Sequence, residues 1–177
     1  MINMTIDIAT NILMQSIENP AFTVFSKIIS YVFDPLTIVI TLIIIGAYLY
    51  TKVSKKQGIF LASIIIITGM IIKISKEIFQ RARPLNALMP DSGFSMPSGH
   101  ATIIVVFFGL IIYLFIQKKY KIGASVTATL IILLIGFTRI YLRTHWLTDV
   151  LTGFLIGGII LITSIIIHKK FDFKKPF

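Results

Sequence analysis

The chain has 177 residues, of which 56% are hydrophobic and 14% are charged, and its formal net charge is +10. A soluble domain carries roughly 25% charged residues, so this composition excludes an ordinary soluble protein and indicates a one-domain integral membrane protein. The chain contains no cysteine, which excludes disulfides, thiolate nucleophiles and cysteine-ligated metal sites. The positive charge could indicate a nucleic-acid partner. We predict none, because the basic residues lie between apolar runs and border a membrane.

Residues 4–33 are apolar but are interrupted by three charged residues and Pro20. A spanning helix needs about 20 mostly apolar residues, which argues against a full span here. The apolar residues lean towards one helical stripe, so residues 1–33 are predicted to form amphipathic helices lying in the membrane interface. A true span in this region, giving six spans in place of five, stays open as an alternative.

Five apolar segments follow, and each is predicted to cross the membrane as a helix. In chain order they cover residues 34–50, 59–78, 98–116, 122–141 and 146–167. The first is expected to begin at Asp34-Pro35, an N-cap residue followed by proline at the first helical position. The predicted fold is therefore all-α: a transmembrane bundle over residues 34–168, followed by a basic tail at residues 169–177.

The basic turns at residues 51–58 and 117–121 lie on the same side of the predicted bundle as the tail. That side holds ten lysines and a single acid, and the positive-inside rule places it in the cytoplasm. The connections at residues 79–97 and 141–146 then face outward. The composition, rich in isoleucine and lysine, suggests a bacterial source, so we expect a multi-pass protein of the bacterial cytoplasmic (inner) membrane with these connections on the periplasmic or extracellular side.

A short turn, Pro97-Ser98-Gly99-His100, precedes the third predicted span. Pro97 suits the first turn of a helix, which puts Ser98 and Gly99 at the helix N-terminus. Unpaired N–H groups and the helix dipole favour an anion there. A histidine at this place can exchange a proton with such an anion near neutral pH. Taken alone, a turn of this kind is more often an ordinary loop.

Ionisable residues gather at two junctions on the same side as His100: Lys76, Arg81 and Arg83 after the second span, and Arg139, Arg143, His145 and Asp149 between the fourth and fifth. Ionisable groups at membrane depth are costly unless they face a cavity or a partner, so they are functional candidates. Lysine and arginine side chains can also reach headgroups from helix ends. We favour that second interpretation for Arg81 taken alone.

His145 and Asp149 are four residues apart and share a helix face. A carboxylate that holds one ring nitrogen fixes the tautomer, which suits His145 as a nucleophile towards phosphorus. His100 can protonate a leaving oxygen. Three cationic side chains suit the oxygens of a phosphoryl group: Lys76, Arg83 and Arg139. A metal site is the competing interpretation of two histidines and an aspartate; the surrounding cations disfavour it.

The chain resembles the type 2 phosphatidic-acid phosphatases in three ordered motifs: Lys76-x6-Arg83-Pro84, Pro97-Ser98-Gly99-His100 and Thr138-Arg139-x5-His145-x3-Asp149. The resemblance implies a helical bundle in which His145 forms a phosphohistidine, Asp149 orients it and His100 protonates the leaving group. It implies a phosphate site made by Lys76, Arg83, Ser98, Gly99 and Arg139, with no metal or other cofactor.

Two residues depart from the family pattern. Thr138 replaces a serine and keeps the hydroxyl. Arg143 stands where relatives commonly carry a small residue, and we hypothesise that it contacts a second phosphate or an acidic headgroup.

The expected function is that of a membrane lipid phosphatase acting on a phosphomonoester or diphosphate. The candidate substrates are undecaprenyl diphosphate and phosphatidylglycerol phosphate, ranked slightly ahead, then phosphatidic acid and lipid A 1-phosphate. The expected partners are this lipid substrate and membrane lipids, with no obligate protein partner. Two alternatives remain: a vanadium-dependent haloperoxidase, disfavoured by the apolar spans, and a non-catalytic lipid transport or binding protein.

Overall fold

The computed structural model describes residues 2–171, and the expected tail residues 172–177 lie outside this part of the chain. The described chain is all-α. Its helices are α1 (Ile2–Ser16), α2 (Pro20–Val32), α3 (Pro35–Tyr48), α4 (Lys55–Phe79), α5 (Gly99–Phe115), α6 (Lys121–Tyr141) and α7 (Leu147–Lys170), with short helical turns η1 (Leu49–Val53) and η2 (Lys118–Tyr120).

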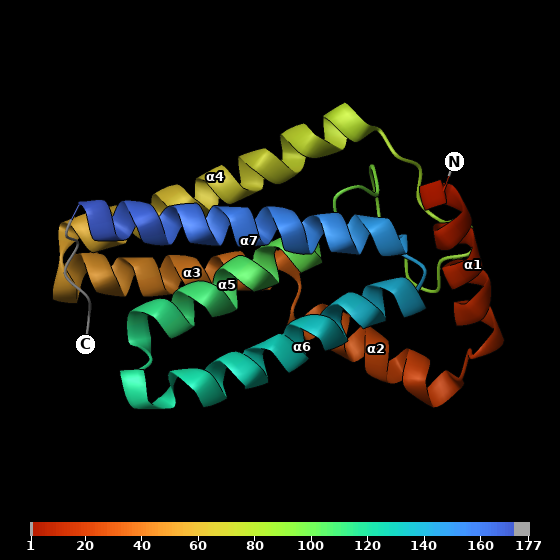
Figure 1. The fold of residues 1–177 in the computed structure, drawn as a ribbon, viewed down its shortest axis with the longest axis horizontal. Helices are drawn as coiled ribbons and strands as arrows, with labels where there is room; N and C mark the ends of the chain where they lie inside the picture. The colour runs from red at the N-terminus through yellow and green to blue at the C-terminus, as the bar shows by residue number, and fades with distance from the viewer. Residues whose placement is uncertain (1, 172–177) are drawn as a thin grey trace.

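Five apolar helical segments form the membrane-spanning part, which confirms the predicted all-α integral membrane bundle. Four are long and apolar enough to cross a bilayer, and the fifth, α5, is a shorter apolar helix; the four are Pro20–Val53, Lys55–Phe79, Lys118–Tyr141 and Leu147–Lys170. The segments lie roughly side by side along the long axis (Figure 1).

Two helix boundaries differ from the expected ones. The first long apolar segment, Pro20–Val53, includes α2 and so reaches into the region where interfacial helices were expected and a span stayed open as an alternative. Asn19 starts α2 by accepting hydrogen bonds from two backbone N–H groups of its first turn. The second segment begins at Lys55, inside the expected basic turn, because the extended Ser54 ends the preceding turn and basic residues fill the first turn of α4.

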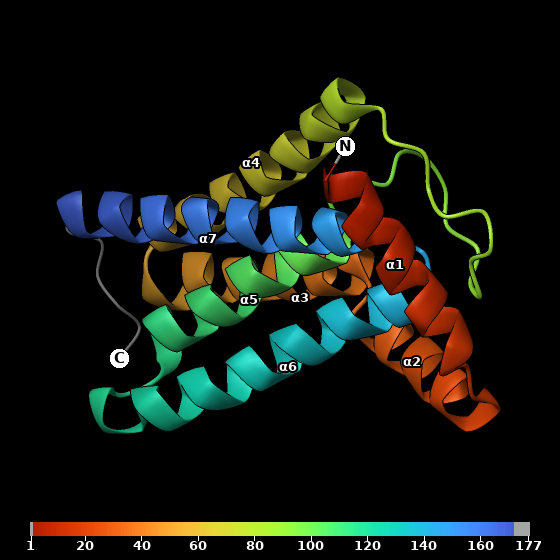
Figure 2. The same ribbon diagram turned by 45° about the vertical axis from the view of Figure 1, so that its right-hand side comes forward.

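The two ends of the bundle differ in what they carry. The turns after α3 and α5 lie at the same end as the end of α7, while α1, the loop of residues 80–98 and the α6–α7 junction lie at the other (Figure 1). Both views show α1 lying across that second end (Figure 2). The α1–α2 turn is joined to α6 there, because the Tyr141 hydroxyl accepts from Asn19 N–H at 2.9 Å and donates to its carbonyl oxygen at 3.1 Å.

The closest helix packing joins α5 to α7. A Cβ atom added at Gly153 would lie 2.8 Å from the Ser98 carbonyl oxygen, and one at Gly157 would lie 2.6 Å from the Thr102 carbonyl oxygen. Small residues four apart let two helix backbones approach closely inside a membrane. The N-terminus of α5 is therefore fixed against the first turns of α7, and Ser98 N–H donates to the Asp149 carbonyl oxygen at 3.0 Å.

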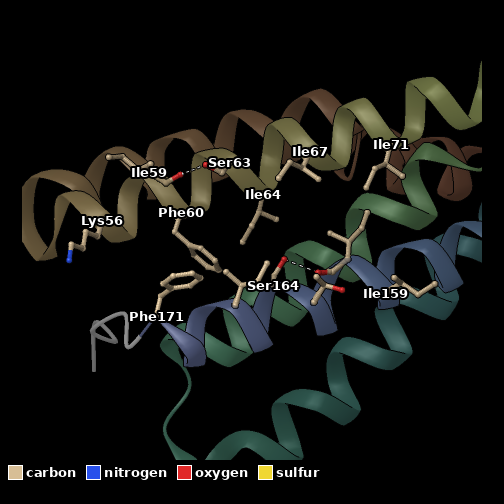
Figure 3. A pocket seen from close by; sticks show the side chains of 13 residues that line it. Lys56, Ile59, Phe60, Ser63, Ile64, Ile67, Ile71, Ile159, Ser164 and Phe171 are labelled. Atoms are coloured by element: carbon tan, nitrogen blue, oxygen red, sulfur yellow. Dashed lines mark hydrogen bonds between the residues drawn. The ribbon is translucent and has the colours of Figure 1, made fainter.

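Two large cavities lie on different sides of α4. The first, which we call the α4–α7 groove, has a volume of about 580 Å³ and is lined by Lys56, Ile59, Ile64, Ile67, Ile159 and Ser164 among others. Figure 3 shows Lys56 at one end and isoleucine side chains along its length. The second, of about 560 Å³, we call the cationic cavity; it is lined by Lys76, Arg83, Asp91, Gly99, His100 and His145 among others.

Candidate active site

The α6–α7 junction positions His145 and Asp149. Arg143 has a positive φ of 55°, and the chain turns there between the two helices. The Asp149 carboxylate is fully buried and accepts the Trp146 backbone N–H at 2.9 Å, so it caps the first turn of α7. His145 Nδ1 lies 3.6 Å from Asp149 Oδ2. The structure therefore brings together the two residues that the sequence spacing paired.

Arg83 fixes the tautomer of His145. Its Nη1 lies 3.3 Å from His145 Nε2 and 2.7 Å from the Thr144 carbonyl oxygen. A guanidinium only donates hydrogen bonds, so Nε2 accepts and the ring proton resides on Nδ1, facing Asp149. This leaves the lone pair of the neutral imidazole on Nε2, at the cationic cavity.

Burial is the largest influence on the pKa of both His145 and Arg83. Burial lowers the pKa of His145 below its ordinary value of 6.5, against the nearby Asp149 carboxylate, which raises it. Burial likewise lowers the pKa of Arg83, while Asp91 raises it. His145 is therefore neutral at pH 7, which is the form that can act as a nucleophile.

Arg139 is the most buried cation of the site, with 1% of its side chain exposed. Its Nη2 donates to Asp91 Oδ2 at 3.0 Å. Its Nε and Nη1 have no hydrogen-bond partner among residues 2–171. Buried donors without partners are costly, so this guanidinium is arranged for acceptors beyond the one it contacts.

The N-terminus of α5 supplies Gly99 and His100 to the cationic cavity. His100 Nε2 lies 3.3 Å from the Ser30 carbonyl oxygen of α2; a carbonyl only accepts, so Nε2 carries the proton in this contact. Ser98 is the N-cap residue, and Pro97 precedes the cap, outside the helix. The Ser98 backbone N–H donates to the Asp149 carbonyl oxygen, so Ser98 joins α5 to α7. Of the two predicted phosphate-binding residues Ser98 and Gly99, Gly99 lines the cavity.

Lys76 lies in the last turn of α4, where its Nζ donates to the Phe94 carbonyl oxygen and the side chain lines the cavity. Thr138 is buried and donates its hydroxyl to the Ile135 carbonyl oxygen within α6. The predicted phosphate-binding residues Lys76, Arg83 and Arg139 thus converge from the end of α4, the loop that follows it and the end of α6, which is distant in the sequence.

Arg143 is not brought to this cluster. Its Nη1 forms an ion pair with Glu18 at 2.9 Å, and its Nε donates to the Asn86 carbonyl oxygen at 2.8 Å. The side chain ties the α1–α2 turn to the loop of residues 80–98. The hypothesis that it contacts a second phosphate therefore has no support in this geometry.

Sequence reasoning missed Arg81 and Asp7 as part of the site. Arg81 forms ion pairs with Asp7 and, at 2.8 Å, with Asp149 Oδ1. Asp7 is 1% exposed and accepts the Thr148 backbone N–H at 2.9 Å at the start of α7. Arg81 therefore fixes the carboxylate that faces His145, instead of reaching headgroups. The charge that interrupts the apolar stripe of α1 was the available signal for Asp7.

Sequence reasoning also missed Asp91, whose carboxylate lies among the predicted phosphate-binding groups. Oδ2 accepts from Arg83 at 2.9 Å and from Arg139 at 3.0 Å, and it lies 3.9 Å from His145 Nε2. Within residues 2–171, no three histidine, aspartate or glutamate side chains are grouped to hold a metal ion; that the chain needs none stays a prediction.

A bundle of apolar helices that buries cations around a neutral histidine defines a class: integral membrane proteins with a cluster of buried cations at one end of the bundle. Residues 57–173 match the model of the PAP2 superfamily. The chain belongs to this family.

Individual relatives agree with the family assignment. The chain is 31% identical over 139 residues to phosphatidylglycerophosphatase B of Bacillus subtilis (strain 168), covering 75% of this chain and 66% of that protein. It is 28% identical over 131 residues to an undecaprenyl-diphosphatase of Sulfolobus acidocaldarius, covering 70% of this chain and 61% of the relative. The matched segments thus span about two thirds of these relatives or less.

The fold is also similar to a solved structure, a transmembrane PAP2-type phosphatidylglycerolphosphate phosphatase from Bacillus subtilis. That similarity has a TM-score of 0.86 at 26% identity and covers 94% of this chain and 86% of that chain.

Proposed function

We propose that this protein is a lipid phosphate phosphatase that acts through a phosphohistidine intermediate. One observation carries the proposal: two arginines from distant parts of the sequence, Arg83 and Arg139, hold a single carboxylate oxygen 3.9 Å from His145 Nε2. An oxyanion position beside a neutral imidazole nitrogen suits attack on a phosphoryl group. The names of the relatives, which describe phosphatases of lipid phosphates, support the same class.

The reaction has two steps. The lone pair of His145 Nε2 forms a bond to phosphorus while the bond from phosphorus to the leaving oxygen breaks, and His100 gives that oxygen a proton. A water molecule then attacks the phosphohistidine, His100 takes the water proton, and the P–N pair returns to Nε2. The net change converts lipid phosphate and water into the dephosphorylated lipid and inorganic phosphate.

The remaining residues orient His145 and neutralise the charge of the phosphoryl group. The Asp149 carboxylate lies 3.6 Å from Nδ1 and favours the ring proton there, so that Nε2 presents its lone pair, and Arg81 forms an ion pair with Asp149. Lys76, Arg83 and Arg139 stabilise the charge on the equatorial phosphoryl oxygens. Apolar residues of α3 that line the same cavity, Leu36 and Val39, can accept the lipid chain at the membrane side of the site.

The substrate class is a terminal phosphate or diphosphate on a lipid: undecaprenyl diphosphate or phosphatidylglycerol phosphate first, then phosphatidic acid or lipid A 1-phosphate. Phosphate release from these four lipids, measured in detergent with EDTA present, tests the class and the independence from metal together. His145→Asn is expected to lower turnover by about 10⁴-fold or more with the fold intact. Wild-type turnover in that variant, or loss of wild-type activity in EDTA, contradicts the mechanism.

The phosphohistidine is tested directly. A short incubation with ³²P-labelled lipid phosphate, followed by alkaline quenching, is expected to leave label on the protein in the wild type and in His100→Asn, and none in His145→Asn. An acid-stable, alkali-labile adduct indicates an acyl phosphate on Asp149 and overturns the assignment of the nucleophile.

We also propose that the site faces outward from a bacterial cytoplasmic membrane, because the lysine-rich turns lie at the opposite end of the bundle. The chain has no cysteine, so single substitutions label cleanly. Ser92→Cys is expected to react with an impermeant maleimide on intact cells and Lys118→Cys is not. The reverse pattern contradicts the orientation.

A further inference from the structure

A second lysine of α4, which belongs to none of the three motifs, lines the cationic cavity. The residues of α4 that line it are Gly69, Ile72, Lys73 and Lys76. Their spacing of three and four places them on one face of the helix. Lys73 comes three residues before Lys76, which puts it about 4.5 Å deeper in the bundle along the helix axis, at about 1.5 Å per residue.

Lys73 lies where the cavity meets the surrounding lipid. The opposite wall comes from the first turns of α3, including Leu36 and Val39. Leu36 is 66% exposed and Lys73 is exposed too. Both views show α4 diverging from α3 towards this end of the bundle (Figures 1 and 2). The apolar part of a bound lipid can therefore leave the cavity between α3 and α4, past Lys73.

No ion pair joins Lys73 to an acid within residues 2–171. Of the acids that line the cavity, Asp91 is held by two arginines, and Asp34 accepts the Leu36 backbone N–H at 2.9 Å. Glu77, one turn further along α4, does not line the cavity. A cation on a membrane-spanning helix is costly unless an anion or water compensates it. The position of Lys73 at a cavity for anions makes a ligand the natural source of that compensation.

We propose that Lys73 binds a second phosphate of the substrate, the one on the lipid side of the phosphorus that His145 attacks. The terminal phosphoryl group already has three cations for its free oxygens: Lys76, Arg83 and Arg139. Lys73 is therefore in excess for a ligand with one phosphate. It stands between the terminal phosphoryl position and the exit of the lipid chain, where the next phosphate of such a substrate lies.

This subsite favours lipids that carry two phosphates in series. A lipid diphosphate and a phosphatidylglycerol phosphate share this feature, whereas phosphatidic acid has a single phosphate. Lys73 gains a charge-assisted contact only with the first two, so its effect differs between the ligands. Lys73 thus takes the role that the sequence suggested for Arg143. The proposal rests on the proposed function, since it places the terminal phosphoryl group at His145.

Two ligands that the enzyme cannot hydrolyse test the subsite. Methylphosphonate carries one phosphonate group, and methylenediphosphonate carries two joined through carbon. Their dissociation constants are measured by calorimetry on the full chain in detergent. Lys73→Gln is expected to weaken methylenediphosphonate binding by about tenfold and methylphosphonate binding by less. Lys73→Arg is expected to retain most of the wild-type preference. Lys56→Gln, which removes a lysine of the same helix at the α4–α7 groove, keeps that preference in full.

Two results overturn the proposal. An unchanged preference in Lys73→Gln would mean that Lys73 contacts the headgroups of the bilayer instead. Equal losses for both ligands would place Lys73 at the terminal phosphoryl group. Lys73→Met, with the melting temperature of each variant, serves as a second test if the glutamine variant folds poorly.

Kinetics identify which second phosphate the subsite binds. Lys73→Gln is expected to lower kcat/KM by about tenfold for undecaprenyl diphosphate, for phosphatidylglycerol phosphate or for both, and by less for phosphatidic acid. Equal losses on all three lipids contradict the subsite. Calorimetry separates the two proposals. If the wild type hydrolyses no lipid phosphate while the preference for methylenediphosphonate narrows in Lys73→Gln, the proposed function fails and the subsite stands. If the wild type hydrolyses lipid phosphate and the preference does not narrow, the subsite alone fails.

Discussion

The two large cavities beside α4 are nearly equal in volume, about 580 Å³ for the α4–α7 groove and about 560 Å³ for the cationic cavity. Their linings differ sharply. Lys56 is the one ionisable residue that lines the groove within the described chain. The Ser63 and Ser164 hydroxyls, which also line the groove, donate hydrogen bonds to carbonyl oxygens of their own helices. The cationic cavity is lined by lysine, arginine, histidine and aspartate side chains.

This contrast shows that buried charge, and not volume, identifies the site. An apolar groove between helices in a bilayer costs little, because lipid chains can fill it. Ionised groups at the same depth are costly unless a partner or a ligand compensates them. The predictions that follow test this difference, from the largest expected effect to the smallest.

Among the tests that compare the two cavities, the largest effect is expected from Arg139→Lys, which keeps the charge and removes the planar guanidinium. Loss of directed donors to a phosphoryl group is expected to lower kcat/KM by about 10²- to 10³-fold, measured as phosphate release from the preferred lipid. Lys56→Arg, a matched exchange of cations in the groove, is expected to leave kcat/KM unchanged. Equal losses in the two variants would remove the distinction between the cavities.

Arg81→Gln is expected to lower kcat by about tenfold with little change in KM, since Arg81 acts through Asp149 and does not line the cavity. Asp7→Asn is expected to act in the same direction, because Asp7 holds Arg81. The double variant should lose little more than the worse single variant, as expected for residues of one network. Fully additive losses, or a change confined to KM, would contradict this positioning role.

The pH profile follows from the state of His145. Burial lowers the pKa of His145 below 6.5, so the neutral, nucleophilic form persists as the pH falls through that value. The acid limb of kcat/KM, with a slope of about tenfold per pH unit, is therefore expected to have its midpoint below pH 6.5. Initial rates between about pH 4 and 8 measure it. A midpoint above 6.5 would mean that the charged imidazole is favoured.

The smallest effects are expected from two substitutions in α4, one in the lining of each cavity. A Cβ atom added at Gly69, which lines the cationic cavity, meets nothing within 4 Å, so the first atom of the side chain in Gly69→Leu has room at the cavity wall. This substitution is expected to raise the KM for lipid substrate several-fold. Ser63→Leu fills the groove instead and is expected to stay within about twofold of wild type. A larger effect from Ser63→Leu would give the groove a part in substrate binding.

Much of the fold could be predicted, because long apolar runs determine membrane helices and Asp34-Pro35 marks the start of α3 as expected. The start of α4 could not, since lysines usually mark a turn and here fill the first turn of a helix. Residues 4–33 were expected to lie in the interface, with a span left open as an alternative, because three charged residues and Pro20 interrupt them. The structure shows that α2 continues, after a break at Phe33 and Asp34, into α3.

The residues of the site also fall into those that the sequence could predict and those that it could not. His145 and Asp149 could be paired by their helical spacing, and the cations of the first and third motifs converge as expected. Asp7 and Asp91 could not be placed, because no local pattern links them to partners 141 and 48 residues away. Arg143 was misjudged for the same reason: its partner, Glu18, lies 125 residues away in the sequence.

The glycines at 153 and 157 bear on how far such a sequence can diverge. The atoms facing them include the carbonyl oxygens of Ser98 and Thr102, which no change of rotamer can move aside. The separation between the start of α5 and the start of α7 is therefore set by main-chain contact. Residues on the lipid-facing surface can be exchanged without altering it.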